Sequence, residues 1–482
     1  MFQFLASTYR YSLLLWNIRK IYEQYKSKDK LDDNDLNTIT LQMIPYIEKC
    51  GCVCIKFCQW LTPILDILLN VKQESHNQLT NDRKPYWLAS LEKFYENCSD
   101  HSLEYTCQVY KQDFNSSLIK DYQVVSIIGS GSIGQVYKLK SLKDNQYYAM
   151  KVVHPSVSYD MKYFKRILTI CFKINYLKTI FRKVLPYNID SFLDLFEKQI
   201  DLIWEANNLC RLRQNYKTND YIQFPELIRF SENIVLMTYE EGVSIDSESV
   251  SQYERAKLVN LLVLFNRQNF EINTFCHGDL HKGNWKVQPY KDRYRLVIYD
   301  FGFCWSYVNP YINQNLSDAF IDSSPADVTP LVKLTVELIN QDKSEEFHEY
   351  IRDTLLGIIK KDNLVADPSV CILGVLKACN EKNLIVEPVI LQTILVFIQI
   401  FKYLDMYGLT NTYEKHPTNE FIYRNIYPNI ISICQSYNIF PDIVHQFQKK
   451  LNHYQPEVSE LFDTLDSTKH ITPEIRNLLK FD

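Results

Sequence analysis

Glycine, excess positive charge and long apolar runs are all scarce in this 482-residue chain. It has only 11 glycines beside 34 tyrosines and 26 phenylalanines, so we expect a glycine to stand where the backbone requires one. Lysine and arginine total 53 against 57 aspartates and glutamates, a balance that argues against nucleic acid as a partner. No stretch reaches the roughly 18–20 apolar residues of a membrane-spanning helix. The nearest, ILQTILVFIQIF at 390–401, predicts a buried helix.

The thirteen cysteines include no C-x-x-C pair, the spacing of many zinc and redox sites. Four of them crowd into KCGCVCIKFCQW, residues 49–60, where Cys50, Cys54 and Cys58 fall on one stripe of a single predicted helix. We interpret them as free, mostly buried thiols in an intracellular reducing compartment, in preference to a metal or redox centre. The polar residues between them, Lys56 and Gln59, then require another explanation.

The N-terminal segment MFQFLASTYRYSLLLWNIRKIYEQ leaves two interpretations open. Its basic residues, Arg10, Arg19 and Lys20, all precede its first acid, Glu23, as in a mitochondrial presequence. The same segment also fits an amphipathic helix that packs on the protein.

Composition and local patterns divide the chain into four segments. Residues 1–70 predict helices, and 71–120 predict a helical and loop connection whose first part, 71–86, is polar and exposed. Residues 121–243 predict a β-rich lobe with inserted helices, because β-branched and aromatic runs alternate there with glycine and polar breaks. Residues 244–482 predict a mainly helical lobe with one short strand pair, NWKVQPY and YRLVIYD. A small β lobe joined to a larger α lobe is the outline of a kinase.

The stretch IIGSGSIGQVYKL contains the pattern Gly129-x-Gly131-x-x-Gly134-x-Val136. In a β-hairpin such glycines let backbone N–H groups close over phosphates where a side chain would collide. Alone the pattern also fits a dinucleotide fold or an ordinary hairpin, but here it lies between strands and opens no helix, which disfavours the dinucleotide use. We expect these four residues and Ser132 to contact a nucleotide.

One strand later, AMKVV places Lys151 where a kinase carries its phosphate-binding lysine. A lone strand lysine is commonly a solvated charge, but its position behind the glycine loop predicts contact with the α- and β-phosphates. A carboxylate on the next long helix should hold it. EKQIDLIWEANNLCRLRQNY, at 197–216, supplies Asp201 and Glu205 four residues apart, on one face of a predicted helix. We assign Glu205 to an ion pair with Lys151.

The strongest signal is FCHGDLHKGNWKV followed by LVIYDFGF. Asp279 and Asn284 have the spacing of H-R-D-x-x-x-x-N, and Asp300 begins a D-F-G tripeptide after a short strand. Phosphoryl transfer requires a carboxylate that orients the attacking hydroxyl and oxygen ligands that hold Mg²⁺. We assign Asp279 as the catalytic carboxylate and Asn284 and Asp300 as Mg²⁺ ligands, with His277 supporting the loop.

The sequence departs from the usual protein-kinase motifs at two points, which narrows the class of kinase. Gly278 stands where most protein kinases carry arginine, so activation by loop phosphorylation has no obvious receptor, and no A-P-E segment follows the D-F-G tripeptide to dock a peptide. The pattern H-G-D-L-H-x-G-N is also that of aminoglycoside and choline kinases. The catalytic loop by itself leaves protein kinases and small-molecule kinases open.

Motifs outside this machinery resemble the UbiB/aarF-domain (ADCK-like) family of atypical kinases. IKFCQW resembles its K-x-G-Q motif, QIDLIWEANNL its helix E-x-D-x-x-x-E-A-x-N-L, and SIGQVYKL with KVVHPSV its loop and post-lysine segment. The resemblance covers residues 50–310. It implies an α+β, two-lobed protein-kinase-like fold with an N-terminal helical extension and a helical C-terminal region.

The same resemblance implies that the chain binds ATP and Mg²⁺ and acts on, or is stimulated by, a lipid or small molecule in place of a protein. It also implies a role in ubiquinone or isoprenoid-lipid metabolism, peripheral membrane association and a mitochondrial or membrane location. The helix with Lys56 and Gln59 would be a lid over the active site, with Asp201 as its nearest acidic contact. Cys58 and Gln199 depart from the family pattern, and so does the GSGS loop, which is alanine-rich in many members.

Two other functions fit the residues. One is a phosphotransferase for a small hydroxylated substrate, of the aminoglycoside or choline kinase type. The other is a nucleotide-binding scaffold that performs no chemistry.

Overall fold

The computed structural model describes residues 2–28, 31–70, 100–173, 189–291, 293–321, 327–362 and 386–406, with short pieces near 87–91, 323, 374–384 and 431–449. The predicted connection at 71–86 lies outside the described residues. The chain forms two compact units. Unit 1 comprises Met1–Ala206 and Glu226–Tyr239, and unit 2 comprises Asn207–Pro225 and Glu240–Asp482.

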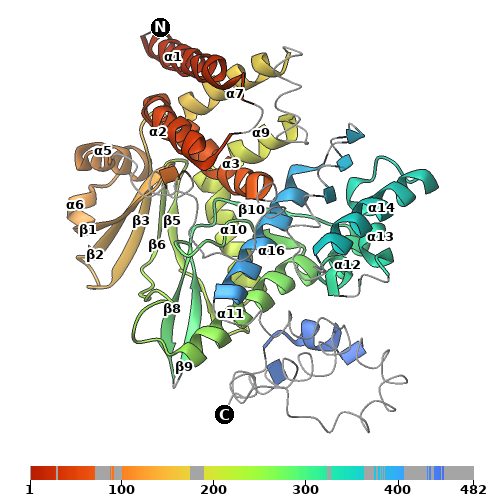
Figure 1. Ribbon diagram of the computed structural model, residues 1–482. Helices are drawn as coiled ribbons and strands as arrows, with labels where there is room; N and C mark the ends of the chain where they lie inside the picture. Colours follow the sequence, from red (N-terminus) through yellow and green to blue (C-terminus); the bar gives the residue numbers. More distant parts are fainter. Residues whose placement is uncertain are drawn as a thin grey trace. The chain divides into compact units, whose positions relative to one another are not determined.

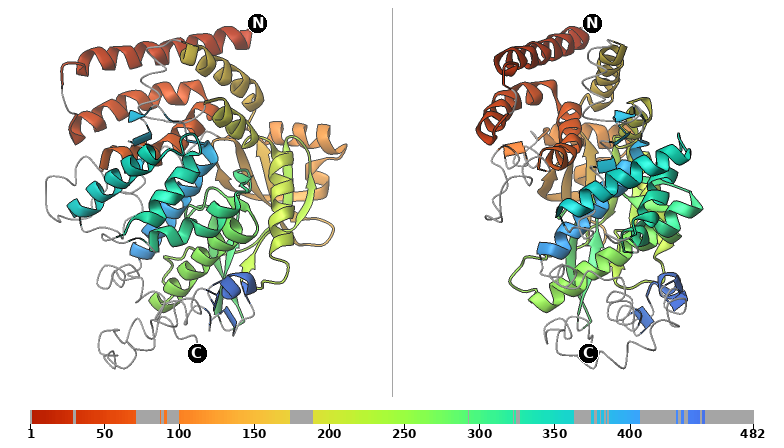
Figure 2. Two further views of the ribbon diagram at one scale, coloured as in Figure 1. Left: turned by 90° about the vertical axis from the view of Figure 1, so that its right-hand side faces the viewer. Right: turned by 45° about the vertical axis from the view of Figure 1, so that its right-hand side comes forward.

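Three helices open unit 1: α1 (Phe2–Tyr25), α2 (Asp33–Cys50) and α3 (Cys52–Asn70) (Figure 2). Helix α2 ends because Gly51 has φ +92°, a conformation that side chains disfavour. The prediction of one helix through the cysteine stripe was therefore wrong, since Cys50 closes α2 and Cys54 and Cys58 lie on α3. The described cysteines, which include all four of this segment, are free thiols.

Aromatic packing joins α3 and α1 to the next helices, α7 (Val157–Lys173) and α9 (Ile189–Lys198). On α3, the rings of Phe57 and Trp60 lie 5.9 and 4.3 Å from the ring of Phe192 on α9. On α1, Tyr11 is buried and lies 5.4 Å from the ring of Tyr163 on α7. These contacts fix the predicted N-terminal amphipathic helix on the body of unit 1.

A five-stranded antiparallel sheet forms the rest of unit 1, in the order β1-β2-β3-β6-β5. The strands are β1 (Tyr122–Ser130), β2 (Gly134–Ser141), β3 (Tyr147–Val153), β5 (Leu227–Phe230) and β6 (Ile234–Thr238). Helices α5 (Leu103–Phe114) and α6 (Leu118–Asp121) pack against it (Figure 1). Their core with the sheet includes Tyr110, Tyr137, Met150 and Leu236, all nearly fully buried. Burying a large apolar side chain contributes about 1.5–3 kcal/mol.

Helix α10 (Leu202–Asn215) follows α9 after a break at 199–201. The prediction of one continuous helix over 197–216 was wrong, because Asp201 caps the new helix. Its carboxylate accepts hydrogen bonds from the N–H groups of Ile203 at 2.9 Å and Trp204 at 3.3 Å. Asp201 is consequently exposed and does not share a helix face with Glu205.

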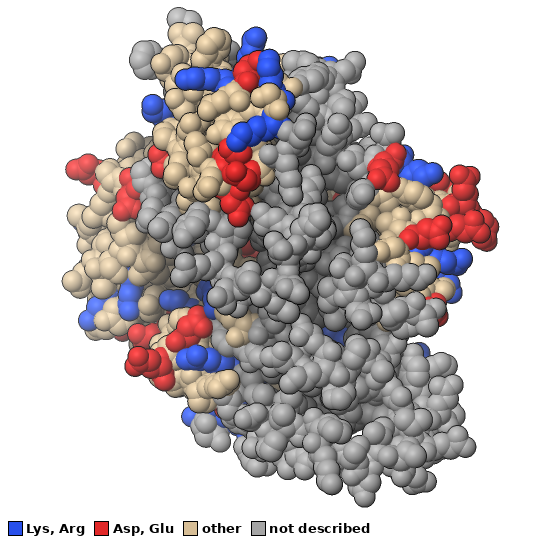
Figure 3. All heavy atoms as spheres, in the orientation of Figure 1, with Lys and Arg blue, Asp and Glu red and all other residues tan. Residues whose placement is uncertain are grey.

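Unit 2 is mainly helical. Its helices are α11 (Gln252–Arg267), the π-helix η1 (Gln268–Ile272), α12 (Pro310–Ile321), α13 (Thr329–Ile339), α14 (Glu345–Asp362) and α16 (Pro388–Met406). The buried helix predicted at 390–401 is the centre of α16, where Ile390, Leu391 and Ile400 are at most 4% exposed. Figure 3 shows acidic side chains gathered over part of unit 2. In the first turn of α14, Glu345 and Glu346 complement the helix dipole. No described helix is long and apolar enough to cross a membrane.

The short strands of unit 2 form two small sheets. The predicted hairpin is present as β8 (Trp285–Tyr290) and β9 (Arg293–Ile298), and β4 (Ile222–Gln223) pairs in parallel with β9. A second pair joins β7 (Phe275–His277) to β10 (Cys304–Ser306). The prediction of a single strand pair here was wrong, because strands of two or three residues carry too little alternation to be recognised.

Candidate active site

The glycine-rich turn connects β1 to β2. The physical reason for having glycine differs among its three glycine positions. A Cβ at Gly134 would lie 2.6 Å from the carbonyl oxygen of Val152, so strand packing requires glycine there. A Cβ at Gly131 would meet nothing closer than 3.7 Å, and one at Gly129 nothing within 4 Å. None of the three has a positive φ. Neither a positive φ nor packing within the described residues therefore requires glycine at Gly129 or Gly131.

Sheet register aligns the turn with the buried lysine. Val136 on β2 is paired with Gly129 on β1 and with Lys151 on β3. Directly paired residues project to the same face of a sheet. These three residues therefore line one face, as a nucleotide-binding surface would require.

Lys151 and Glu205 form a buried ion pair. The Lys151 ammonium lies 2.9 Å from Oε1 and 2.7 Å from Oε2 of Glu205, and the two side chains are 11% and 2% exposed. Charges removed from water are stable only when paired this closely. The pair holds the ammonium at a fixed point of β3.

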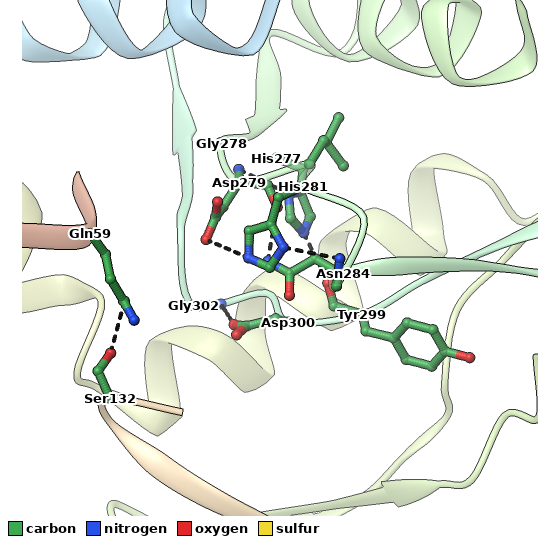
Figure 4. Close-up of polar contacts among 12 residues, drawn as sticks. Gln59, Ser132, His277, Gly278, Asp279, His281, Asn284, Tyr299, Asp300 and Gly302 are labelled. Carbon is green, nitrogen blue, oxygen red and sulfur yellow. Dashed lines mark hydrogen bonds and ion pairs between the residues drawn. The ribbon is translucent and has the colours of Figure 1, made fainter. Parts of the chain in front are cut away.

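Helix α3, which carries Lys56 and Gln59, contacts the glycine-rich turn. Ser132 is buried, and its hydroxyl donates to Oε1 of Gln59 on α3 at 3.1 Å (Figure 4). Lys56 lies on the same helix and is half-buried. Asp201, in contrast, is occupied in capping α10.

In unit 2, hydrogen bonds define the loop around Asp279 (Figure 4). His277 accepts from the Asp279 N–H at Nδ1, 3.3 Å away, so its Nε2 carries the proton and donates to the Tyr299 carbonyl at 3.1 Å. Burial lowers the pKa of His277, which keeps this ring neutral. His281 accepts the Gly283 N–H at Nδ1, which directs its Nε2 toward Asp279, 3.7 Å from Oδ2.

Asn284 and Asp300 lie on the two segments that meet beside this loop (Figure 4). Asn284 donates from Nδ2 to the Asp279 carbonyl at 2.9 Å, and its own carbonyl accepts from the Tyr299 N–H at 2.8 Å. Asp300 has φ +53°, and its carboxylate accepts from the Gly302 N–H at 3.3 Å. Residues held in this region of φ are strained by roughly 1–3 kcal/mol and cluster at functional sites.

The donor set of Asn284 and Asp300 suits magnesium. Mg²⁺ prefers oxygen ligands and commonly takes one or two carboxylates together with substrate phosphates. Across the part of the chain that the structure describes, no three His, Cys, Asp or Glu side chains form a metal-binding group of their own. A magnesium ion here would thus depend on the nucleotide for part of its coordination.

Three supporting residues escaped sequence reasoning. Asn208 on α10 donates to the carbonyl oxygen of Phe301, the central residue of D-F-G, at 2.9 Å. It is the asparagine of the E-A-x-N-L pattern, so the sequence motif marks this position but does not indicate its hydrogen-bond partner. Gln392 on α16 donates to the Gly278 carbonyl at 3.0 Å, and Tyr403 donates to the Leu280 carbonyl at 3.2 Å. Helix α16 therefore supports the catalytic loop, a role that no local pattern indicates.

Gly278 is required by packing. A Cβ there would lie 1.7 Å from Cζ3 and 2.1 Å from Cη2 of Trp305, whose ring is buried on β10. The Gly278 N–H also donates to the Phe303 carbonyl at 2.7 Å. No side chain, arginine included, fits this position without moving the ring.

Substitution Gly278→Ala should therefore lower the stability of unit 2 by about 1–3 kcal/mol, the usual penalty of overpacking a core. Thermal unfolding of the variant measures this loss. Gly357→Ala is the matched control, because a Cβ at Gly357 on α14 meets nothing within 4 Å. Alanine should stabilise that helix by about 0.5–1 kcal/mol. Equal unfolding temperatures for the two variants would contradict the packing argument.

A glycine-rich hairpin before a buried lysine–glutamate pair, and a D-x-x-x-x-N loop that leads into D-F-G, define the kinase-like class of proteins. A family model described as the ABC1 atypical kinase-like domain matches residues 93–334. The chain therefore belongs to the ABC1 atypical kinase-like family. This confirms the kinase-like fold and the resemblance to the UbiB family found in the sequence.

Three curated relatives illustrate the match. A probable serine/threonine-protein kinase of Dictyostelium discoideum, abkC, is 26% identical over 52% of this chain and 35% of its own length. An ABC1 family protein of Saccharomyces cerevisiae, named as mitochondrial, is 26% identical over 61% and 44%. A probable protein kinase UbiB of Tolumonas auensis is 21% identical over 70% and 66%. The chain thus matches less than half the length of the first two.

Among solved structures, the chain is similar to that of an Rv3197–erythromycin complex from Mycobacterium tuberculosis. The TM-score is 0.41 and the identity 18%, over 54% of this chain and 67% of that one.

Proposed function

We propose that this chain is an ATP-dependent atypical kinase or ATPase that binds Mg-ATP. The observation that carries the proposal is the pair Gly129 and Gly131. Neither backbone conformation nor packing within the described residues requires glycine at these positions, so a ligand that approaches the backbone is the remaining physical reason. Phosphate groups are such a ligand.

The residues of unit 1 would hold the phosphates. The N–H groups of Ser132 and Ile133 have no acceptor within the described part of the chain, which leaves them available for phosphate oxygens. Lys151, fixed by Glu205, would neutralise the charge of the α- and β-phosphates. Val136, paired with both Gly129 and Lys151, would contribute apolar contact on the same face.

The residues of unit 2 would support the transfer. Asp279 would orient the attacking hydroxyl or water and receive its proton, and Nε2 of His281 lies 3.7 Å from its Oδ2. Asn284 and Asp300 would hold Mg²⁺, which when bound neutralises charge on the β- and γ-phosphates. His277 and Asn208 would keep the backbone of the two segments in place.

We propose a lipid or small molecule as the acceptor, or as the stimulator of ATP hydrolysis. Helix α3 supplies Gln59 to Ser132, so it occupies space next to the glycine-rich turn. Trp305 packs against Gly278 and leaves no room there for the arginine through which many protein kinases bind an activating phosphate. Both features disfavour a peptide substrate, although the names of the Dictyostelium and Tolumonas relatives describe probable protein kinases. The family resemblance favours ubiquinone or another isoprenoid lipid, at a membrane surface.

We also propose a mitochondrial location, on the basis of two relatives. The relatives in Saccharomyces cerevisiae and Schizosaccharomyces pombe are both named as mitochondrial. Fractionation of cells that express the tagged chain would test it, and recovery outside mitochondria would contradict it.

A thermal-shift titration tests the nucleotide proposal. A ligand at 100 times its Kd stabilises the folded state by about 2.7 kcal/mol, so the unfolding temperature should rise with ATP and Mg²⁺ together and much less with either alone. No rise under any combination would overturn the proposal.

Turnover then identifies the acceptor. Phosphate release that rises with vesicles containing a phenolic isoprenoid lipid supports the proposed class. Release that depends on choline or an aminoglycoside favours the small-molecule phosphotransferase, and phosphorylation of an added protein favours a protein kinase. Tight binding of Mg-ATP without any turnover favours the scaffold.

A further inference from the structure

Buried polar side chains form a continuous hydrogen-bonded chain beneath the glycine-rich turn. It runs from Gln135 through Tyr137, Thr106, His101 and His154 to the carbonyl oxygen of Gly131. The successive heavy-atom distances are 2.7, 2.8, 2.9, 2.8 and 2.9 Å. Four of the five side chains are at most 3% exposed, and His101 is half-buried.

The donor and acceptor roles along this hydrogen-bonded series follow from Gln135, its first member. The backbone N–H of His101 donates to Oε1 of Gln135 at 2.9 Å, so the amide of Gln135 turns its NH₂ toward Tyr137. Tyr137, which already accepts this proton, must donate its own to Thr106, its other hydrogen-bond partner. Thr106 then donates to Nε2 of His101. His101 therefore carries its proton on Nδ1 and donates it to Nδ1 of His154.

The other end gives the same direction independently. The Gly131 carbonyl oxygen can only accept, so His154 carries its proton on Nε2 and presents a bare Nδ1 to His101. Each histidine is thus a neutral ring in a defined tautomer. Burial is the largest cause that lowers the pKa of His101, to about 4, and the neighbouring His154 adds to it, while Asp100 acts in the opposite sense. Burial also lowers the pKa of His154.

The hydrogen-bonded series ends at Gly131, one of the two glycines on which the nucleotide proposal rests. The Gly131 N–H donates to the Gly134 carbonyl at 3.0 Å, and its carbonyl is held by His154, so both polar groups of Gly131 are fixed. The backbone N–H of His154 also donates to the Ile133 carbonyl at 2.9 Å. Two carbonyl oxygens of the turn, which would repel a phosphate, are thereby held in hydrogen bonds with His154.

We propose that His154, oriented by His101, is a positioning residue that fixes the glycine-rich turn for phosphate binding. His154 follows the last residue of β3 and lies three residues after Lys151, so one short segment supplies both the proposed phosphate-binding cation and the support of the turn. The inference rests on the proposed nucleotide-binding function. It assigns the histidine pair a role in ligand affinity in addition to any role in folding.

The test compares His154→Phe and His101→Phe with Tyr105→Phe. Tyr105 donates to the Val153 carbonyl at 3.3 Å. It thus joins α5 to the same strand but is not part of the hydrogen-bonded series from Gln135 to Gly131. Loss of one such hydrogen bond corresponds to about a fivefold change in an equilibrium. We expect each histidine variant to bind Mg-ATP about fivefold or more weakly in calorimetric titration, with its affinity for adenosine unchanged. Tyr105→Phe should bind both as the wild type does.

A second measurement serves if the histidine variants fold poorly. In ¹⁵N-labelled wild-type protein, NMR should show His154 as the Nε2–H tautomer and His101 as the Nδ1–H tautomer at neutral pH. Any other tautomers, or a charged His101, would overturn the inference. Equal losses of Mg-ATP and adenosine affinity would also overturn it, because they indicate a merely structural role. Failure of wild-type protein to bind Mg-ATP would instead refute the proposed function, and this positioning role with it.

Discussion

Replacing Asp300 with asparagine should abolish magnesium-dependent binding and turnover of ATP. The amide removes the negative charge that a Mg²⁺ ligand of D-F-G must supply, and neutralisation of phosphate charge by the metal is central to phosphoryl transfer. Turnover should fall by at least about a hundredfold, as it does when a preorganised electrostatic group is lost. Phosphate release and the Mg²⁺-dependent thermal shift measure the two effects.

Asparagine is the informative substitution because of the backbone. Asp300 has φ +53°, which asparagine tolerates and alanine does not, and an amide oxygen can still accept from the Gly302 N–H. The fold should therefore survive. Asp353→Asn, an equal charge change on the exposed face of α14, is the control and should behave as wild type. Turnover that persists in Asp300→Asn would contradict the proposed role of Asp300 as a Mg²⁺ ligand and weaken the kinase proposal.

Local spacing explains why much of the site could be predicted. Asp279 and Asn284 are separated by one tight loop, and the β8–β9 hairpin that follows has a polar turn between β-branched runs. Such features depend on few residues close in sequence, and so one sequence suffices to recognise them. The pairing of Lys151 with Glu205 also followed, because kinases place these residues on neighbouring elements.

Helix ends show what sequence reasoning overlooked. The apolar residues around Asp201 fit a continuous helix, but an aspartate followed by a turn of apolar residues is also an N-cap signal. In the structure, Asp201 is the N-cap of α10. At Gly51 the same choice arises, since one glycine between two helical runs either remains inside a helix or ends it. Packing of α2 and α3 decides such cases, and packing is not visible in a local window.

Long-range contacts could not have been predicted. Gln392 and Gly278 are separated by 114 positions, and Asn208 and Phe301 by 93. Their side chains meet because the fold brings the segments together, and nothing in either segment names its partner. The histidine pair is similar, since His101 and His154 are 53 positions apart and their tautomers depend on three further side chains.

The second large effect is expected at Lys151. Lys151→Met should remove Mg-ATP binding and also destabilise unit 1, because it leaves the Glu205 carboxylate, 2% exposed, without its ammonium partner. Breaking a buried ion pair on one side costs about 3–5 kcal/mol. Thermal unfolding without nucleotide measures the loss of stability, and calorimetric titration with Mg-ATP measures binding. A surface comparison is Lys165→Met, whose ion pairs with Asp194 and Glu197 are solvent-exposed and should contribute at most about 1 kcal/mol.

The double variant Lys151→Met with Glu205→Leu separates the two effects. Replacing both buried charges by apolar groups of similar volume is often neutral, so most of the lost stability should return. Mg-ATP binding should not return, because the phosphates still lack the cation that β3 presents beside Gly129 and Val136. A double variant that binds Mg-ATP as the wild type does would show that Lys151 serves the fold alone. One that remains as unstable as Lys151→Met would show that loss of the ion pair with Glu205 is not the cause of the instability.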